Sequence, residues 1–340
     1  MAAVAAILLL LTACSSGKSS GTSQAGKTKK SGSLRIAYLQ KQADQQYFVD
    51  ELNGGKSEAK SLSGGITITS ANLASDANLA ISAVKAAIAQ KADGIIIVPP
   101  DPAVGPQVVA LANAANIPLL TSDDQICTNA PDPTKCDSKN LIPRVGFSGT
   151  QMGTEVGKKA GELFKTAGWK AADTAILSEW QQDVTVCTDR VKAAGVAFKA
   201  ASGGASPRII NVGTDNTPSG AQSKTSALLN ANRTVKHWVV WGCNDENVQG
   251  AVTALQNGTV AANDIIGVGL GAYLACKSWQ SNKPTGMKAA LFINGVDVGK
   301  LSVKIMYDHI RKGTAFPHES FAPTKMVGPT DWQQAGLKCV

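Results

Sequence analysis

Short apolar segments alternate with longer amphipathic segments along most of the chain. The run Gly94–Val98 is apolar on both faces, which is typical of a central strand in a parallel sheet covered by helices. Between Asp76 and Gln90 the apolar residues recur at roughly helical spacing, behind an aspartate that can cap a helix. Further strands are predicted at Leu34–Leu39, Ile66–Thr69, Ile117–Thr121, Thr174–Leu177, Arg208–Asn211, Trp238–Trp241 and Ile265–Val268.

Helical segments lie between these strands, for example at Thr150–Thr166, Ser219–Ala231 and Gly299–Lys312. Repeated β-α units with buried strands indicate an α/β fold. The units are too many for one comfortable sheet, so we predict two similar doubly wound parallel-sheet lobes, joined by a hinge that the chain crosses several times. The expected first lobe comprises residues 34–146 plus 293–325, and the second comprises residues 147–292 plus 326–340.

The N-terminus has the pattern of an export signal. Residues 1–14 contain the apolar run Ile7–Leu11 and end in Leu11-Thr12-Ala13-Cys14, which matches a bacterial lipobox. We therefore expect a signal peptide and a lipidated Cys14; the alternative is a plain apolar N-terminus. Residues 15–33 are mostly Ser, Gly, Thr, Lys and Gln, a composition typical of a flexible tether. The layout predicts a lipoprotein anchored to the outer face of the cell membrane.

Cysteine parity agrees with export. The chain has 7 Cys, and six remain when Cys14 is set aside for the lipid, an even number suited to an oxidising compartment. Cys127 and Cys136 flank one polar loop and are expected to pair. For the other four we expect the pairs Cys187–Cys243 and Cys276–Cys339, with free buried thiols as the alternative. No CxxC occurs and no His lies beside a Cys pair, so no metal site is expected.

The formal charge of +8 raises the question of nucleic-acid binding. Lys18, Lys27, Lys29 and Lys30 precede the first strand, so half of the excess lies in the tether. The remainder is too diffuse to follow a phosphate backbone. Nucleic acid is therefore not an expected partner.

Candidate binding residues follow the predicted strands, because open α/β sheets bind ligands at the C-terminal ends of their strands. Lys41, Asp123, Asp124, Trp180 and Asn244 lie at such positions, and Tyr47 and Phe48 follow the first of them closely. Charged and amide groups beside aromatic rings suit a sugar, which offers hydroxyls and an apolar C–H surface.

Four stretches carry a resemblance to a known family: Leu34–Phe48, Ala92–Pro102, Ile117–Gln125 and Val235–Gly269. The last contains Gly242-Cys243-Asn244-Asp245 and, further on, Asn263-Asp264-Ile265-Ile266-Gly267. With these motifs the chain resembles the periplasmic sugar-binding proteins of ABC transporters, most closely their L-arabinose-binding members. The resemblance implies the type I periplasmic-binding-protein fold.

The resemblance also implies roles for individual residues. Lys41 stands where the family's Lys bonds ring hydroxyls, Asp124 where an Asp binds the anomeric hydroxyl with Asp123 beside it, and Asn244 where an Asn binds a hydroxyl. Arg190 takes the place of the Arg that bonds the ring oxygen. Among the aromatic positions, Tyr47 stands where a Trp packs on the sugar, Phe48 where a Phe follows it, and Phe147 where the family has a Met. Trp180 is a further candidate because it lies at the end of a predicted strand.

Three positions depart from the L-arabinose-binding pattern. Gln45 replaces a Glu, Gly271 replaces an Asn and Leu274 replaces an Asp. Each change removes a hydroxyl partner, and a site built to bond a hydroxyl discriminates strongly against ligands without a match. The resemblance thus implies a pentose or hexose and leaves open which one; a larger ligand that uses the space at Gly271 is the alternative.

The function implied is capture of a monosaccharide by hinge closure for uptake by an ABC transporter permease. We expect a monomer, with no cofactor and no catalysis.

An alternative is a sensory receptor that presents sugar to a chemoreceptor or histidine kinase. A sugar repressor would need a DNA-reading helix-turn-helix before residue 34, where the lipobox and tether lie. Adjacent Asp123 and Asp124 point opposite ways on an extended chain, which disfavours a catalytic carboxylate pair.

Overall fold

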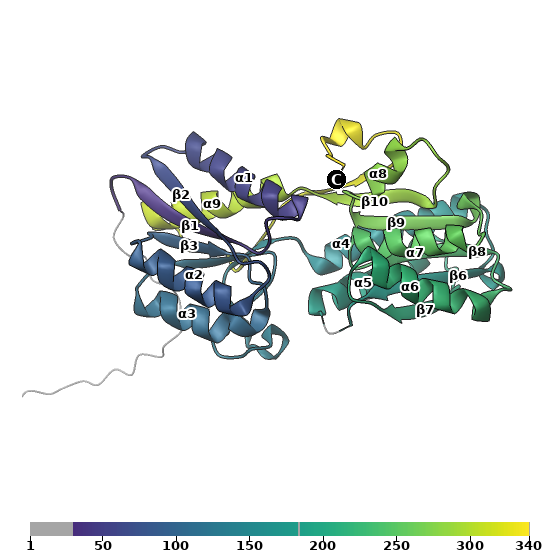
Figure 1. The fold of residues 1–340 in the computed structure, drawn as a ribbon, viewed down its shortest axis with the longest axis horizontal. Helices are drawn as coiled ribbons and strands as arrows, with labels where there is room; N and C mark the ends of the chain where they lie inside the picture. The colour runs from purple at the N-terminus through teal and green to yellow at the C-terminus, as the bar shows by residue number, and fades with distance from the viewer. Residues whose placement is uncertain (1–29, 183, 340) are drawn as a thin grey trace, which may run out of the picture.

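The computed structural model describes residues 30–182 and 184–339 and places them in two lobes, each built on a six-stranded sheet (Figure 1). Cys14 and the tether up to Lys29 lie outside the described residues. Across the sheet of lobe 1 the strands are β11 (Glu319–Phe321), β5 (Arg144–Gly146), β4 (Leu119–Ser122), β3 (Gly94–Ile97), β1 (Leu34–Gln40) and β2 (Ile66–Asn72). Across lobe 2 they are β12 (Thr324–Val327), β10 (Met287–Ile293), β9 (Ile265–Gly271), β8 (His237–Gly242), β6 (Thr174–Trp180) and β7 (Arg208–Gly213).

Helices cover both faces of each sheet, which confirms the predicted α/β class. Lobe 1 carries α1 (Gln46–Ser61), α2 (Ala77–Ala89), α3 (Gly105–Ala114) and α9 (Gly295–Lys312). Lobe 2 carries α4 (Gly149–Thr166), α5 (Thr185–Ala201), α6 (Pro218–Leu229), α7 (Asp245–Asn257) and α8 (Ala275–Gln280). The helix predicted behind Asp76 is α2, and the Asp76 carboxylate accepts bonds from the amides of Asn78 and Leu79.

Strand β1 shows why both faces are apolar. Ile36 and Tyr38 pack into the cluster that includes α1 and α9, whereas Ala37 and Leu39 pack into the cluster that includes α2 and α3. Successive side chains of a strand point to opposite faces, so a strand between two helix layers must be apolar throughout. The chain's uninterrupted apolar runs are therefore a consequence of its layered fold.

Two features of the fold are not predicted by the sequence patterns. Helix α1 carries Gly54 and Gly55 in its middle, which weakens its helical signal. These glycines, with Gly299 on α9, let the two helices pack closely, because a Cβ on Gly299 would overlap the carbonyl of Glu51. The sheet of lobe 2 is also not wholly parallel, since β12 pairs antiparallel with β10.

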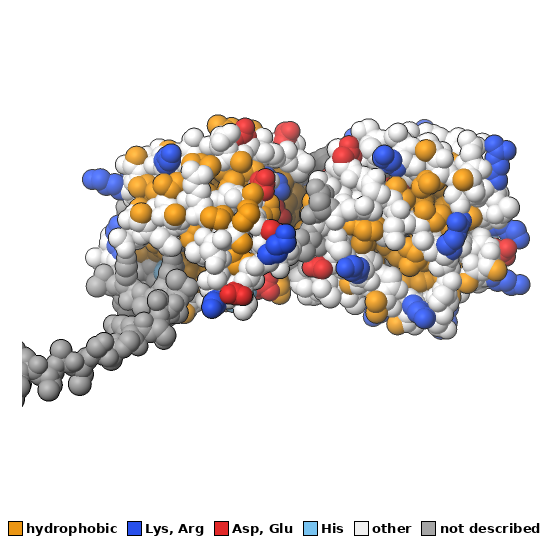
Figure 2. All heavy atoms as spheres, turned by 90° about the horizontal axis from the view of Figure 1, so that it is seen from below, with side chains coloured by type: hydrophobic (Ala, Val, Ile, Leu, Met, Phe, Trp, Pro, Cys, Tyr) orange, Lys and Arg blue, Asp and Glu red, His pale blue; other side chains and the backbone are white. Residues whose placement is uncertain are grey.

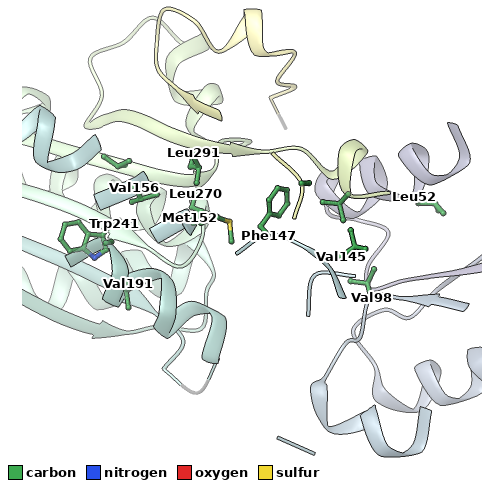
Figure 3. Packing of buried hydrophobic residues seen from close by; sticks show 14 of the residues in the cluster. Leu52, Val98, Val145, Phe147, Met152, Val156, Val191, Trp241, Leu270 and Leu291 are labelled. Carbon is green, nitrogen blue, oxygen red and sulfur yellow. The ribbon is translucent and has the colours of Figure 1, made fainter. Parts of the chain in front are cut away.

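The chain passes between the lobes at three places. It leaves lobe 1 between β5 and α4, returns between β10 and α9, and crosses again between β11 and β12. Phe147 lies in the first crossing and is only 4% exposed. Its ring lies between a group of core side chains from each lobe, so the apolar packing continues through the hinge (Figure 3).

Three disulfides join Cys127 to Cys136, Cys187 to Cys243 and Cys276 to Cys339. These are the three pairs predicted from the sequence. The first closes the polar loop after β4, the second joins the start of α5 to the residue after β8, and the third ties the C-terminal segment to α8.

Candidate functional site

The carboxyl ends of β1 and β4 bring an ion pair together in lobe 1. Lys41 directly follows β1, and Asp124 lies two residues after β4. Lys41 Nζ is 2.8 Å from Asp124 Oδ2, and the two side chains are 24% and 26% exposed. The Asp124 carboxylate raises the pKa of Lys41 above its ordinary value. The pair therefore presents both a hydrogen-bond donor and an acceptor at a surface that solvent still reaches.

Asp123 is held from several sides. Its backbone adopts the left-handed conformation, with φ +59, and its carbonyl accepts a 2.7 Å bond from Arg144 Nη1. Tyr47 donates its hydroxyl to Asp123 Oδ1 at 2.7 Å, while Oδ2 is buried without a hydrogen-bond partner. Burial, reinforced by the charge of Asp124, raises the pKa of Asp123 to about 6. A buried acceptor with free capacity is suited to a ligand hydroxyl.

A second carboxyl group lies behind this one. Glu51 follows Tyr47 by one turn of α1, is fully buried, and accepts bonds from the hydroxyls of Tyr38 and Ser122. Burial raises the pKa of Glu51 well above its ordinary value, and the charge of Asp123 adds to the effect. The carboxylates of Asp123 and Asp124 thus lie in front of a buried carboxyl group, that of Glu51, which accepts bonds from two hydroxyls.

The predicted aromatic residues converge at the start of α1 and the first crossing. The ring of Tyr47 lies 5.2 Å from that of Phe48, edge to face, and 6.5 Å from that of Phe147. Tyr47 and Phe48 are half-buried. Gln45, also predicted in the site, is exposed at the start of α1, and its side chain makes no capping bond. Phe147 is deeply buried in the hinge, and its contact with a ligand stays a prediction.

Lobe 2 contributes Arg190, Trp180 and Asn244. Arg190 lies on α5 and donates from Nη1 to the carbonyl of Cys243 at 2.9 Å, whereas its Nε is buried without a partner. Trp180 ends β6, is half-buried and donates from Nε1 to Thr188. Asn244 caps α7, with Oδ1 accepting from the amide of Asn247 and Nδ2 donating to the carbonyl of Asn216. The Asn244 side chain is thus largely occupied within the protein.

Charges of the two lobes act on one another across the hinge. Burial lowers the pKa of Arg190, while Asp123 and Asp124 raise it. In the same way Arg190 and Lys41 oppose the rise in the pKa of Asp123. Figure 2 shows the surface narrowing between the lobes, with acidic and basic side chains on both sides of the narrowing. Asp123 and Asp124 of lobe 1 therefore lie within electrostatic range of Arg190 of lobe 2.

Some residues that shape the site lie outside the sequence prediction. Asn216 follows β7 by three residues, so the strand-end rule would have found it had it been applied to that strand. Arg144 joins the Asp123 carbonyl to Glu319 of β11, and Glu51 carries no strand-end signal at all. Two positions that depart from the L-arabinose-binding pattern are Gly271 and Leu274. Gly271 has a φ of +123°, and the amide of Leu274 donates to the buried carboxylate of Asp245 at 2.7 Å.

A pocket of about 780 Å³ lies at the opposite end of the lobe 2 sheet. Its lining includes Lys236 and Trp238 at the start of β8 and Asp264 just before β9. Because ligands of open α/β sheets bind at the carboxyl ends of strands, we do not place the functional site there.

The described part of the chain holds no cluster of three His, Cys, Asp or Glu that could bind a metal ion. Among residues 30–182 and 184–339, no helix has the length and apolarity needed to span a membrane.

Comparison with known proteins gives consistent results. Residues 36–314 match the sequence profile of the periplasmic binding protein domain family. The ABC transporter L-arabinose-binding periplasmic protein of Azospirillum brasilense is 27% identical over 310 residues, which cover 91% of this chain and 90% of that protein. The L-arabinose-binding periplasmic protein of Escherichia coli (strain K12) is 26% identical over 285 residues, 84% of each chain.

Solved structures show the same fold. An ABC transporter periplasmic solute-binding protein from Actinobacillus succinogenes, with bound D-allose, superposes with a TM-score of 0.71 at 20% identity over 88% of this chain and 99% of that one. An arabinose-transporter binding protein from Shewanella, bound to L-arabinofuranose, gives a TM-score of 0.69 at 19% identity, covering 89% of this chain and 94% of that one.

Proposed function

The chain belongs to the periplasmic binding protein domain family, and on this premise we propose that it is an extracytoplasmic solute-binding protein that captures a pentose or hexose for an ABC transporter. The curated relatives that it matches are both arabinose-binding proteins of this kind. The observation that carries the proposal is the pairing of Lys41 with Asp124 on lobe 1, with Asp123 and Asp124 in electrostatic range of Arg190 on the other lobe. These groups are donors and acceptors suited to hydroxyls.

The proposed mechanism is hinge closure. A sugar that bonds Asp123 and Asp124 on lobe 1 and Arg190 on lobe 2 stabilises the closed arrangement, because only that arrangement makes both sets of bonds. In this proposal Tyr47 and Phe48 cover the C–H face of the ring, which their adjacent rings at the start of α1 support. The domains that move are residues 34–146 plus the segment from α9 to β11, against the rest of the body. The ligand leaves unchanged, since binding needs no bond to break.

The test is a thermal-shift screen of the exported chain against pentoses, hexoses and polyols, followed by calorimetry. The panel includes L-arabinose, D-galactose, D-ribose, D-allose and myo-inositol. A ligand present at about 1,000 times its dissociation constant adds roughly 4 kcal/mol of stability, which is a large shift. A shift with one monosaccharide and recovery of that sugar unaltered would support the proposal. No shift with any member of the panel would contradict it.

The proposal includes a lipid anchor at Cys14 and a monomeric body. Its support is the apolar run and lipobox of residues 1–14 and the polar tether that follows. Mass spectrometry of membrane-extracted protein should find a lipid-modified Cys at the new N-terminus, and C14S should release the protein from the membrane. An unmodified Cys14 on membrane-extracted protein would contradict the anchor. Sedimentation of the detergent-solubilised protein should give the mass of one chain.

A further inference from the structure

The disulfide between Cys187 and Cys243 lies beside Arg190 in the lobe 2 half of the site. Cys187 belongs to the first turn of α5, and Cys243 follows β8 directly. The two cysteines are 1% and 3% exposed, and their Cα atoms are 4.7 Å apart. The bond joins segments separated by 56 residues. It therefore locks the start of α5 to the loop that leads into α7.

Arg190 lies directly on this covalent link. It follows Cys187 by one helical turn, and its Nη1 contacts both the carbonyl oxygen of Cys243, at 2.9 Å, and the Sγ of Cys243, at 3.5 Å. The other side of α5 is fixed as well, because Gly153 of α4 lies so close to the Arg190 backbone that a Cβ would overlap its carbonyl. The backbone of Arg190 is thus fixed by its contact with α4, and its guanidinium by Cys243 of the disulfide.

Asn216 extends the same network to a third loop. Its Nδ2 donates to Cys187 Sγ at 3.5 Å, and its carbonyl accepts from Asn244 Nδ2 at 3.0 Å. Its Oδ1 accepts from the amide of Gln181, at 3.0 Å, and from Asn247 Nδ2, at 2.8 Å. The loops after β6, β7 and β8 therefore all meet around the disulfide, at the end of the sheet where ligands bind.

We propose that the Cys187–Cys243 disulfide is a positioning element of the ligand site, which acts by holding the Arg190 guanidinium in place for the sugar. The inference rests on the proposed function. A long Arg side chain loses much rotamer freedom when it binds, and a support that fixes it beforehand lowers that cost. The Cys127–Cys136 disulfide closes a loop of lobe 1 and makes no contact of this kind with Arg190.

The test is a mutant cycle on the exported chain, with L-arabinose and D-galactose as the calorimetric probes. C187S/C243S is expected to weaken binding of the better probe at least 10-fold, whereas the control C127S/C136S changes it less than 2-fold. In the R190M background, opening the same disulfide should change affinity less than 2-fold, because the group it positions is gone. An equal loss with and without Arg190, or no loss at all, would overturn the proposal.

Two further measurements keep the outcome decisive. If C187S/C243S fails to fold, C187A/C243V fills the space of the sulfurs with carbon and carries the same expectation. Hydrogen exchange tests the positioning without any sugar, through the amides of Gln181 and Asn247, which bond to Asn216 and Asn244. Opening the disulfide should speed their exchange at least 10-fold and leave the Val98 amide of lobe 1 unchanged. Unchanged exchange at Gln181 and Asn247 would overturn the positioning role, whereas failure of the wild type to bind any sugar of the panel would instead contradict the proposed function.

Discussion

The two lobes share one plan but hold the charged groups of the proposed site by different means. In lobe 1, Asp123 and Asp124 are held by non-covalent bonds from Tyr47 and Lys41. In lobe 2, Arg190 is held against a disulfide and the carbonyl of Cys243. Asp123 of lobe 1 is a carboxyl group whose pKa is raised to about 6, so its charge responds to pH near neutrality. An arginine stays charged throughout that range, because its ordinary pKa lies far above it.

Each lobe also buries a carboxyl group behind its site, and these differ in their connection to it. Glu51 accepts from two hydroxyls, and the charge of Asp123 contributes to its raised pKa. Glu179 accepts from Thr225 at 2.5 Å, and burial raises its pKa to about 8, with no contribution from the site carboxylates. The comparison indicates that protonation of Glu51 is coupled to the proposed ligand site, whereas protonation of Glu179 affects the stability of lobe 2.

The largest expected effect is on binding through lobe 1. Asp124→Ala should weaken monosaccharide binding by about 2–4 kcal/mol, or about 30- to 1,000-fold, because it removes a charge-assisted bond and leaves Lys41 without its partner. Calorimetry with the best sugar of the panel measures this. The matched control is Asp132→Ala, a surface aspartate paired with Lys135, which should bind as the wild type does. Wild-type affinity in Asp124→Ala would remove Asp124 from the site.

The next effect is on the stability of lobe 2. The pKa of Glu179 is raised to about 8, so between pH 5 and 8 the folded state holds a proton that the unfolded state releases, and stability falls as the pH rises. Glu179→Gln should remove roughly 2–4 kcal/mol of this fall, measured by denaturant unfolding across that range. Glu162→Gln, an exposed residue near Lys158, should leave the slope unchanged. An identical slope in Glu179→Gln and wild type would show that Glu179 does not titrate in this window.

A smaller effect concerns the pH dependence of binding. Asp123 faces Asp124, Lys41, Tyr47 and Arg190, with Glu51 behind it. Affinity should fall by up to about 10-fold between pH 7 and pH 5, because protonation removes an ionised acceptor as the pH drops through about 6. Asp123→Asn should abolish this dependence while the protein still folds. A wild-type affinity that is constant from pH 7 to pH 5 would show that the Asp123 charge does not contribute to binding.

The smallest effect is expected at Gln45, the exposed residue at the start of α1. Its side chain makes no capping bond, so Gln45→Ala should change affinity less than about 2-fold and stability by less than about 0.5 kcal/mol. Calorimetry and denaturant unfolding measure both quantities. A loss of 10-fold or more would mean that Gln45 reaches the ligand when the lobes close, and would extend the lobe 1 half of the site to the start of α1.

The sequence alone determined the layered α/β architecture, because strands buried between two helix layers must be apolar on both faces, as Gly94–Val98 is. It also pointed to Lys41, Asp123 and Asp124, since the strand-end rule depends only on where apolar runs stop. Only the tertiary structure decided how these groups are held. Tyr47 reaches Asp123 across 76 positions of sequence, and Arg190 reaches Cys243 across 53. Glu51, Asn216 and the close packing of α1 on α9 likewise depend on contacts between distant segments, and no local pattern of residues records which distant side chain will lie within 3 Å.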